Sequence, residues 1–575
     1  MAHAVPSSSA PASVLYNQCV SAIESHVEQL LQWKKWYDSR VHDTAGEAAL
    51  IYRVHTARHE VLDIVRRACD DSSRFVEGAI PRDDSVGSPK HTTSQGSHVL
   101  APASAGWNLL WTWQQPNLDL SKLLCWQRIN HFPHNSQLTR KDFLKKNINR
   151  YRALRGFKHA AVFDIMPETF SLPSERVAFV QAFVHDSLQS RAGHVSEPDQ
   201  SELEHRSLWI LKPVALSRGR GIRVIDSLRD VHYLHDGTGS PMVAQRYIAD
   251  PLLLRGYKFD LRLYVLATSL HPLECFIYRE GFARLASMPY SCQPDHLRDT
   301  LRHITNTAVQ QAAVMGSSTD AMAPQSESAQ AEAPGNDPHA SCTKISLTTL
   351  WQLLKEDGID VDVLWRKISE VVVTTLTCTE DAIPPCSNAF ELFGFDILID
   401  RSLRPWLLEV NSSPSMECST TLDRIIKRRM VHDTLALVDP PRFDRDRLLQ
   451  LLQIRLHSGS WFPELCSLPT AGRSAAANAD VVIKKRWNRE LHALLKGHVP
   501  RPFGQVPAVS KVERSAGPIN HPPDTSGSEQ DGENTEEDSD RAVSPSNLAF
   551  EMVAPSRFYE QLVRMKRTAF SSPFA

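Results

Sequence analysis

The stretch FELFGFDILIDRSLRPWLLEVNSSPSM, residues 390–416, predicts a β-hairpin with an acidic residue in each arm. An apolar, aromatic-rich run ends at Ile399, a polar turn follows at Arg401–Arg404, and a second strand extends over Trp406–Asn411. The local pattern therefore defines two antiparallel strands and the turn between them.

Pairing about this turn brings Asp396 and Glu409 opposite each other, and Asn411 shares the face of Glu409 because side chains alternate along a strand. Two facing carboxylates repel, and a divalent cation is the usual remedy. Oxygen ligands of this kind suit Mg²⁺, which typically lies between protein carboxylates and substrate phosphates. From these residues alone, a sheet whose acids face solvent is an equally good interpretation.

Length and composition limit what the rest of the chain can be. A sequence of 575 residues is too long for one compact core and predicts roughly two to four units. The formal net charge of −2 gives no bulk electrostatic reason to expect nucleic acid or a membrane as partner. We expect no signal peptide and no transmembrane segment, because no apolar run is suitable. Ten scattered cysteines without a CxxC pair predict reduced thiols in a cytosolic protein and no zinc site.

The N-terminal part predicts a helical extension over residues 1–80. An apolar stripe at three-four spacing extends from Val20 to Val41, and residues 49–68 predict a partner helix that folds back on it. This pair could serve docking or dimerisation, or it could pack on the main domain. Residues 81–105 are rich in Ser, Pro, Gly and His and are interpreted as a linker.

The C-terminal part offers little that could form a core. Residues 441–499 predict a short helical extension with two amphipathic stretches. The Pro-, Ser- and acid-rich segment over residues 500–547 is expected to be disordered. Residues 548–575 predict a C-terminal tail that contains one helix, over 558–570.

The main folded block is expected over residues 106–440, interrupted by a low-complexity, disordered insert at residues 312–340. Inside it, SLWILKPVALSRGRGIRVI predicts two strands joined by a basic, glycine-bearing flap. Such a flap can lie over phosphates, because glycine lets backbone N–H groups approach while the basic side chains add charge. Its spacing is neither GxGxxG nor that of a P-loop, and a hairpin with solvated basic residues is the alternative. The residues concerned are Lys212, Arg218, Gly219, Arg220 and Gly221.

Two further strands supply polar groups. MVAQRYIADPLLL predicts an apolar strand whose exit could hold a flat base against its backbone. In YKFDLRLYVLAT, Lys258, Asp260 and Arg262 alternate with apolar residues, which predicts a central strand with charges facing a pocket. Additional polar candidates are Lys141 in the first turn of a helix, Arg284 in the following strand, and Thr305 and Asn306 in a loop.

Six segments occur in the order INHFP…LTRKDFLKKNINRYR, LWILKP…SRGRGI, YIADPLLLRGYKFDLRLYVL, YREGFARLA, HITN and ELFGFDILIDRSLRPWLLEVNSSPSM. Together they resemble the tubulin tyrosine ligase-like family, over roughly Trp107–Asp439. The resemblance implies an α/β (α+β) ATP-grasp fold with a mostly antiparallel central sheet. The segments INHFP, RKDFLKKNINRYR and DTLALVDP are most similar to the polyglutamylase branch, whose members modify axonemal and neuronal tubulin.

The resemblance also implies a role for each matched residue. The residues expected to contact ATP are Lys141, Lys212, the lid residues Arg218, Gly219, Arg220, Gly221 and Ile222, the adenine hinge Gln245, Arg246, Tyr247 and Ile248, and Lys258, Asp260, Thr305 and Asn306. The expected Mg²⁺ ligands are Asp396, Glu409 and Asn411. Arg284 is expected to bind the carboxylate of the incoming amino acid, and Lys212, Arg220 and Arg284 are the expected catalytic side chains.

The implied reaction is the ATP-dependent joining of a carboxylate to an amine through an acyl phosphate. The expected product is an isopeptide bond between free glutamate and a γ-carboxylate in the acidic C-terminal tail of tubulin. The expected location is the cytoplasm, on the cytoskeleton of a ciliary or flagellar axoneme or basal body. A glycine or tyrosine ligase of the same fold, or a catalytically weak scaffold subunit of a ciliary or microtubule complex, are the alternatives.

One position departs from the family pattern. Gln311, directly before the insert, stands where the family usually has a lysine that helps to hold the amino acid. The donor therefore stays open, and an impaired enzyme or an alignment shifted into the insert are both interpretations. The cluster Lys484–Arg486 is a candidate docking surface for an acidic tail, although solvated helix surface is the simpler interpretation. Because no long cationic module follows the core, we expect weak activity alone and help from partner subunits.

Overall fold

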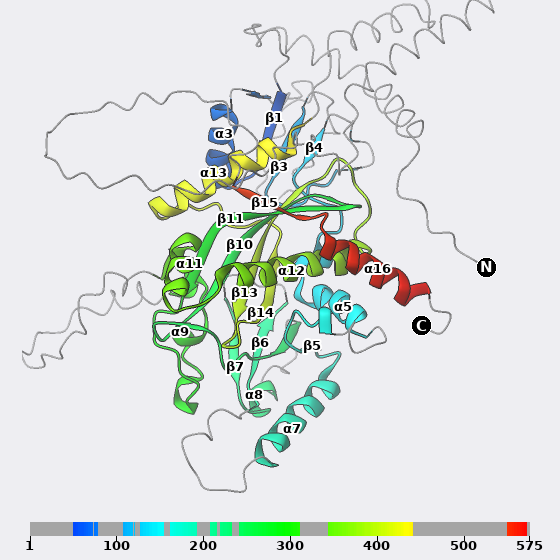
Figure 1. Ribbon diagram of the computed structural model, residues 1–575. Coiled ribbons are helices and arrows are strands. Elements are labelled where there is room, and N and C mark those ends of the chain that lie inside the picture. The colour runs from blue at the N-terminus through cyan, green and yellow to red at the C-terminus, as the bar shows by residue number, and fades with distance from the viewer. Residues whose placement is uncertain are drawn as a thin grey trace, which may run out of the picture.

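The computed structural model describes the chain over residues 50–72, 74–78, 107–118, 120, 123, 127–153, 161–192, 207–214, 219–232, 241–310, 343–440 and 549–571. Within these ranges the strands form three β-sheets, and helices flank them (Figure 1). The predictions for the first helix, the linker, the insert and the segments over 441–499 and 500–547 concern residues outside the described ranges.

The central sheet is antiparallel and is built around two long neighbouring strands, β10 (Tyr257–Leu270) and β11 (Leu273–Leu285). Its order is β12-β11-β10-β13-β14, with β15 also paired to β11 and β9 to β10. The bounds of the other strands are β9 Leu253–Leu254, β12 Lys344–Ser346, β13 Glu391–Ile399, β14 Pro405–Asn411 and β15 Phe550–Ala554.

Both faces of this sheet are covered. Along β10, Leu263 and Val265 pack into one hydrophobic core, whereas Tyr264 and Leu266 pack into a second core on the other face. The helices α11 (Leu347–Glu356) and α12 (Val361–Glu380) contribute to the first core, and α13 (Thr421–Val438) contributes to the second. A strand enclosed in this way has to be apolar on both sides, as VLAT at the end of the charged strand predicted.

A smaller antiparallel sheet has the order β5-β8-β6-β7 and lies below the central sheet in Figure 1. The helix α7 (Arg176–Ala192) packs on it, with the rings of Phe179 and Trp209 5.1 Å apart. The bounds of its strands are β5 Thr169–Leu172, β6 Trp209–Pro213, β7 Arg223–Ile225 and β8 Met242–Arg246. The mixed architecture with antiparallel sheets confirms the predicted fold class.

The remaining helices are short connections around these sheets. None of the helices in the described ranges is long and apolar enough to span a bilayer. The bounds of these remaining helices are α4 Ser136–Thr139, α5 Lys141–Arg152, α8 Arg229–His232, α9 Thr300–His303 and the 3₁₀ turn η4 Pro294–His296.

The prediction of a helix over residues 49–68 was wrong in its first part. Leu50–His55 form strand β1, which pairs in parallel with β3 (Leu109–Thr112) and β2 (Phe75–Glu77), while β4 (Arg128–Ile129) completes this third sheet. Only the helix α3 (His59–Asp71) follows the predicted pattern. A short apolar run does not distinguish a buried strand from a helix, and of the two partner strands of β1, β3 lies more than fifty residues away.

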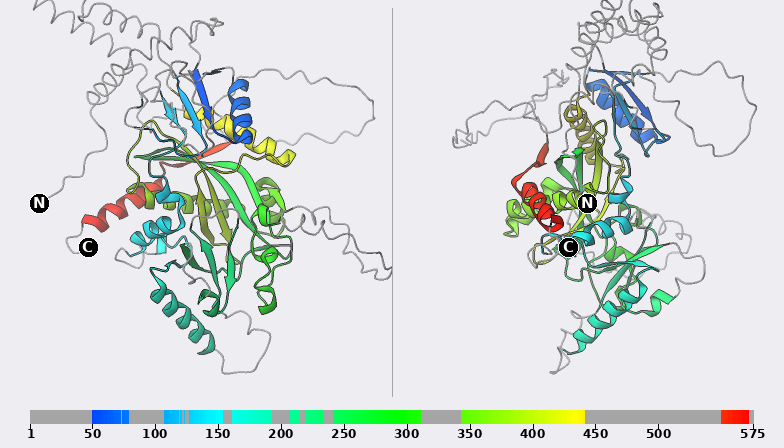
Figure 2. Two further views of the ribbon diagram at one scale, coloured as in Figure 1. Left: turned by 180° about the vertical axis from the view of Figure 1, so that it is seen from behind. Right: turned by 90° about the vertical axis from the view of Figure 1, so that its right-hand side faces the viewer.

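The predicted C-terminal tail, residues 548–575, contains more regular structure in its described part than the one expected helix. The helix α16 (Arg557–Ser571) confirms the predicted helix, but β15 precedes it and joins the central sheet beside β11. The views of Figure 2 show both elements, in red, against the central body. Leu562 of α16 is fully buried in the main core. The described part of this tail therefore belongs to the folded body.

Candidate active site

The hairpin of β13 and β14 has the predicted register. Asp396 lies directly opposite Glu409, and the turn residues separate Ile399 from Pro405. A bulge follows this pair, because Ile397 is opposite Leu407 and leaves Leu408 without a partner. An extra residue of this kind re-aims the side chains next to it. Both Leu408 and Glu409 consequently line the same cavity.

Cationic side chains surround the two carboxylates. Arg262 donates to Asp396 at 2.6 and 3.1 Å, and Arg284 lies 2.9 Å from the same carboxylate. Burial alone would raise the pKa of Asp396, but these guanidinium groups more than offset it and hold that pKa well below its usual range. Glu409 lies on the neighbouring strand β14, and the ammonium group of Lys141, from helix α5, lies 3.0 Å from its carboxylate.

The strand register explains this clustering. Asp260 lies opposite Arg284 across β10 and β11, and Arg262 lies opposite Asp396 across β10 and β13. Arg284 also donates to both oxygens of Asp260, at 2.7 and 2.6 Å. The charged face predicted for β10 thus alternates in sign from Arg284 through Asp260 and Arg262 to Asp396. On the next strand Glu409 adds a second carboxylate beside Asp396.

The three predicted metal ligands fit Mg²⁺ chemically. Asp396 and Glu409 offer carboxylate oxygens, and the amide nitrogen of Asn411 points to Glu409 at 3.4 Å and to the carbonyl of Gly394 at 3.5 Å, which leaves the amide oxygen for another partner. Two carboxylates and one amide form the hard oxygen set that Mg²⁺ prefers. Asn411 lines the adjoining cavity described below and not the cavity of the other two ligands.

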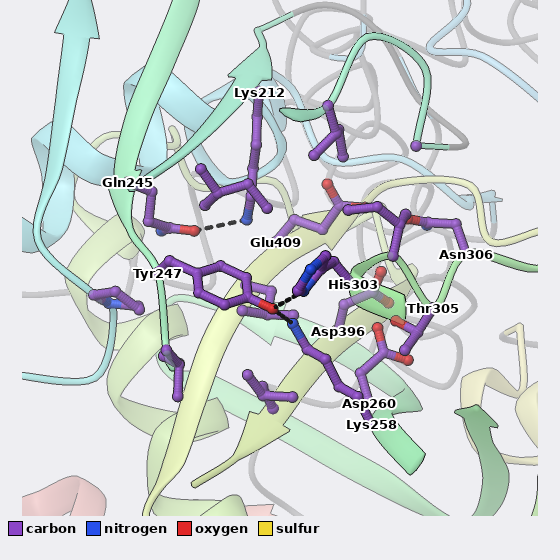
Figure 3. A pocket seen from close by; sticks show the side chains of 18 of the residues that line it. Lys212, Gln245, Tyr247, Lys258, Asp260, His303, Thr305, Asn306, Asp396 and Glu409 are labelled. Carbon is purple, nitrogen blue, oxygen red and sulfur yellow. Dashed lines mark hydrogen bonds between the residues drawn. The ribbon is translucent and has the colours of Figure 1, made fainter. Parts of the chain in front are cut away.

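Lys212 lies one residue before the end of strand β6 and points into the cavity, where it donates to the side chain of Gln245 at 2.6 Å (Figure 3). Gln245 in turn donates to the hydroxyl of Thr169 at 3.0 Å. Burial lowers the pKa of Lys212 to about 8, against the opposing effect of Glu409. A buried amine of this kind gains from an anionic ligand that replaces its lost hydration.

The strands β6 and β7, which flank the flap, pair in the predicted antiparallel form. Gly219 and Gly221 have φ angles of +73° and +70°, which glycine adopts readily. Arg220 is exposed and lines the cavity, together with Gly219 and Ile222. Gly221 does not line it, and Arg218 lies outside the described residues.

A second buried lysine belongs to the hinge side of the cavity. Lys258 donates to the hydroxyl of Tyr247 at 2.8 Å, and this hydroxyl donates to Nδ1 of His303 at 2.8 Å (Figure 3). The other ring nitrogen of His303 donates to the carbonyl of His296 at 3.0 Å, a tautomer that the hydrogen-bond partners define. Burial lowers the pKa of Lys258 to about 7. The pKa of His303 is lowered to about 4, mainly by burial and in addition by the nearby charge of Lys258.

One cavity between the two antiparallel sheets brings most of the predicted residues together. The predicted residues that line it are Lys141, Lys212, Gly219, Arg220, Ile222, Gln245, Arg246, Tyr247, Ile248, Lys258, Asp260, Arg284, Thr305, Asn306, Asp396 and Glu409. The sequence predicted Ile222 and Ile248 of its apolar lining but not Ile210, Leu398 and Leu408, nor His303. Ile210 and Leu398 each lie two residues from a predicted polar residue on the same strand face, so alternation was a usable signal. Leu408 gave no such signal, because the bulge places it there.

A second cavity adjoins the first and shares Arg284, Asn306 and Glu409 with it. Its cationic lining residues outnumber its acidic ones, which are Glu409, Glu417 and Asp423. The cationic residues are Arg58, Arg262, Arg284, Lys344 and Lys427. Lys344 is the register partner of Arg284 across β11 and β12. This excess of positive charge favours an anionic ligand.

Comparison with known proteins agrees with the predicted resemblance. Tubulin polyglutamylase TTLL5 of Mus musculus is 36% identical over 355 residues, which cover 60% of this chain and 24% of the mouse protein. Probable tubulin polyglutamylase TTLL2 of Homo sapiens is 33% identical over 333 residues, 58% of this chain and 50% of the human protein. Tubulin monoglutamylase TTLL4 of Homo sapiens is 31% identical over 356 residues, 60% of this chain and 26% of that protein. The matches thus span a quarter to a half of the length of these relatives.

The profile of the Tubulin-tyrosine ligase family matches residues 118–447, which is more than half of the chain. This range contains both antiparallel sheets except β15, which pairs with β11, and it includes the hairpin of Asp396 and Glu409. With this match and the two adjoining cavities, the chain belongs to the tubulin-tyrosine ligase family.

Proposed function

We propose that the protein is an ATP-dependent ligase that joins glutamate to a γ-carboxylate in the acidic tail of tubulin. The observation that carries this proposal is the junction of two cavities of different character. One has buried lysines and paired carboxylates suited to a nucleotide with Mg²⁺, and the other has an excess of cations suited to acidic substrates. Arg284 and Glu409 line both, so the two ligands would meet there.

The first cavity fits ATP in two parts. Ile210, Ile222 and Leu398 supply apolar walls beside the hinge Gln245–Ile248, where a flat base can accept and donate backbone hydrogen bonds. Lys212 and Lys141 lie toward the carboxylates, where they would offset phosphate charge.

The reaction needs an activated carboxylate, because an amine cannot displace oxide. Transfer of the γ-phosphoryl group from ATP to the acceptor carboxylate gives an acyl phosphate and ADP. The amine of the incoming amino acid then attacks the acyl carbon, phosphate leaves, and one proton is released. Mg²⁺, held by Asp396, Glu409 and Asn411, would neutralise charge on the phosphate oxygens. Lys212 and Arg220 would orient and neutralise the same oxygens within a site shielded from water.

The second cavity supports an acidic substrate. Arg284 is already bonded to Asp260 and Asp396. Lys344 and Lys427 both pair with Asp423, so two ammonium groups there face one carboxylate. Arg58 adds a further cation to the same lining, which supports an incoming anion. Gln311, which departs from the family pattern, lies outside the described residues. Lys344 follows the insert and lies beside Arg284, where it would supply a cation for the donor amino acid.

The names of the relatives support glutamate as the donor, since TTLL5 and TTLL4 are named a tubulin polyglutamylase and a tubulin monoglutamylase. The resemblance to polyglutamylases of axonemal tubulin also supports our proposal that the protein acts on the cytoplasmic cytoskeleton of cilia or flagella. We also propose that the protein acts together with partner subunits. The candidate docking cluster Lys484–Arg486 lies outside the described residues.

An incorporation assay on microtubules tests the proposal. Wild type and Glu409→Gln are compared with labelled glutamate, glycine and tyrosine, each with and without ATP and with and without cell extract. We expect ATP-dependent incorporation of glutamate by wild type only, stronger with extract. Incorporation of glycine or tyrosine instead would mean that this amino acid is the donor. Equal turnover of Glu409→Gln and wild type would exclude Glu409 as a metal ligand. No incorporation under any condition would support a scaffold role.

A further inference from the structure

The C-terminal segment 549–571 packs on the folded body although it is distant in sequence from the elements that it contacts. The helix α13 ends at Val438, and β15 begins at Phe550, more than a hundred residues later. The strand then pairs with β11, with Phe550 opposite Tyr278 and Ala554 opposite Cys275. Pairing with a strand that distant in sequence is entropically costly, so the contacts that follow must hold the segment in place.

The main polar contact of the segment is a buried lysine. Lys566 of α16 donates to Glu380 at 2.6 Å, to Asp381 at 3.1 Å and to the carbonyl of Thr377 at 3.3 Å. These groups form the C-terminal end of α12, where carbonyls lack helical partners and a cation is favoured. Burial alone would lower the pKa of Lys566, but Glu380 more than offsets this effect and raises the pKa above its ordinary value. The ammonium group is therefore charged at neutral pH.

The same end of α12 holds the helix α5. The hydroxyl of Tyr151 donates to Asp381, and Arg150 donates to Asp381 at 2.8 Å. The ammonium group of Lys566 also lies 5.4 Å from the centre of the Tyr151 ring. Figure 1 shows α16, α12 and α5 side by side, and the views of Figure 2 agree. The last turn of α5 is thus clamped between α12 and the C-terminal segment.

The first residue of α5 is Lys141, which contacts Glu409 across the candidate active site at 3.0 Å. A helix of this length is stiff, and Leu144, Ile148 and Tyr151 bury one face of it in the main core. Displacement of its last turn would therefore shift its first turn. A continuous set of contacts extends from Lys566 through Asp381 and Tyr151 to Lys141 and Glu409.

We propose that residues 549–571 are a clasp that fixes α5, and that Lys566 is a positioning residue for Lys141. The inference about the clasp rests on contacts alone, while its effect on nucleotide binding rests on the proposed function. No residue of the clasp lines the two cavities. The clasp acts through α12 and α5.

Hydrogen–deuterium exchange of the full chain tests the clasp without reference to activity. In Lys566→Met we expect exchange over residues 141–152 and 377–381 to rise by about tenfold, with no change in β6 and β8. Lys566→Arg should restore most of the protection, because it keeps the charge and several donors. Arg564→Met, two residues away on an exposed position of the same helix, is the matched control. Unchanged exchange in α5 would overturn the proposal.

If Lys566→Met fails to fold, Asp381→Asn decides the question. It weakens the contacts to Tyr151 and Arg150 but leaves the contact of Lys566 with Glu380, so α5 should lose protection while α16 keeps it. Protected α5 in this variant would contradict the proposal.

A double-mutant cycle tests the effect on the site. Lys566→Met and Lys141→Met should each weaken binding of a non-hydrolysable ATP analogue several-fold, about fivefold in magnitude, and the double variant should bind no worse than Lys141→Met. Additive losses would show that Lys566 does not act through Lys141. If wild type binds no ATP analogue, the proposed function fails, and the exchange experiment still stands.

Discussion

At the scale of single residues, Asp396 and Glu409 differ although they face each other. Asp396 is 2% exposed and is held by Arg262 and Arg284, whereas Glu409 reaches into the open cavity and contacts Lys141. Asp396 therefore compensates buried cationic charge in addition to its proposed contact with the metal, whereas Glu409 is the more accessible of the two carboxylates. Substitutions that remove one of the two charges at a time should therefore show which carboxylate mainly affects the stability of the fold and which mainly affects turnover.

We predict that Asp396→Asn lowers the free energy of unfolding by about 3 kcal/mol or more, because it leaves the buried Arg262 uncompensated. Glu409→Gln should change that free energy by less than about 1 kcal/mol, since its pair is partly exposed. Turnover of Glu409→Gln should nevertheless fall on the order of a hundredfold, as when one electrostatic group is removed from an active site. Urea denaturation and the incorporation assay measure the two effects. Equal stability losses in both variants would contradict this division.

The two buried lysines predict a pH dependence of nucleotide binding. In the free protein the pKa of Lys258 is about 7 and that of Lys212 is about 8, and anionic phosphates favour their protonated forms. Binding should therefore take up protons, and affinity should fall as the pH rises from 7 to 9. Calorimetry in buffers of different ionisation enthalpy measures the uptake. In Lys258→Met the component of proton uptake that is centred near pH 7 should disappear. An unchanged pH dependence of proton uptake would refute the assignment of this component to Lys258.

Stability should change in the opposite direction with pH. Unfolded lysines keep their protons up to a pKa of about 10.4, so between the folded pKa values and that limit the unfolded chain binds more protons. The contribution of Lys258 and Lys212 to folding therefore becomes more favourable as the pH rises above about 7 toward 10. The opposite trends distinguish protonation of the site from a general loss of structure.

At the scale of elements, the flap between β6 and β7 packs tightly on the loop of Asn306. A methyl group on Gly219 would lie 2.6 Å from Val309 and 3.1 Å from the side-chain oxygen of Asn306. Valine is stiff at its first torsion and cannot easily move aside. At Gly219 the flap therefore approaches the Asn306 loop closely, and glycine at this position permits their contact.

We predict that Gly219→Ala weakens binding of the ATP analogue about tenfold, because the flap must shift from the cavity that it lines. Gly256→Ala is the matched control, since its φ of +85° is equally unfavourable for alanine but its Cβ would meet nothing within 4 Å. That variant should lose about 1 kcal/mol of stability with unchanged affinity. Similar affinities of the two variants would mean that backbone strain, not the packing of the flap, determines binding.

Elements whose contacts are local could be predicted from the sequence. The hairpin of β13 and β14 has an apolar first arm, a polar turn and a second strand directly after it, so the pairing of Asp396 with Glu409 could be predicted. The bulge at Leu408 did not follow, because one extra residue leaves the pattern of the arms almost unchanged. The strands β1 and β15 were missed since their partners, β3 and β11, lie far away in sequence.

At the scale of the whole molecule, segments distant in sequence complete the candidate site. The N-terminal elements β1 and α3 pack beside β3 and α13, which brings Arg58 to the second cavity. The C-terminal clasp supports α5 from the other end of the chain. The family match begins only at residue 118, so Arg58 lies outside the matched range although it lines a cavity of the site.

Arg58 should contribute to recognition of an acidic acceptor. Its guanidinium group lies 4.6 Å from the ring of Trp113, which orients it, and 3.4 Å from Glu60, with 41% of the side chain exposed. We predict that Arg58→Gln weakens binding of an acidic tubulin-tail peptide about fivefold, the equivalent of about 1 kcal/mol for a half-exposed charge. The difference should shrink at high salt, where exposed charges are screened.

Fluorescence anisotropy of a labelled tail peptide measures this loss, with calorimetry of the ATP analogue alongside. Arg67→Gln is the matched control, because Arg67 lies on α3, is 57% exposed and does not line the second cavity. Arg58→Gln should weaken peptide binding relative to this control and leave nucleotide affinity unchanged. A loss of nucleotide affinity, or equal peptide binding by the two variants, would mean that the acceptor binds elsewhere. Only the expected result would make the N-terminal elements part of the substrate-binding surface.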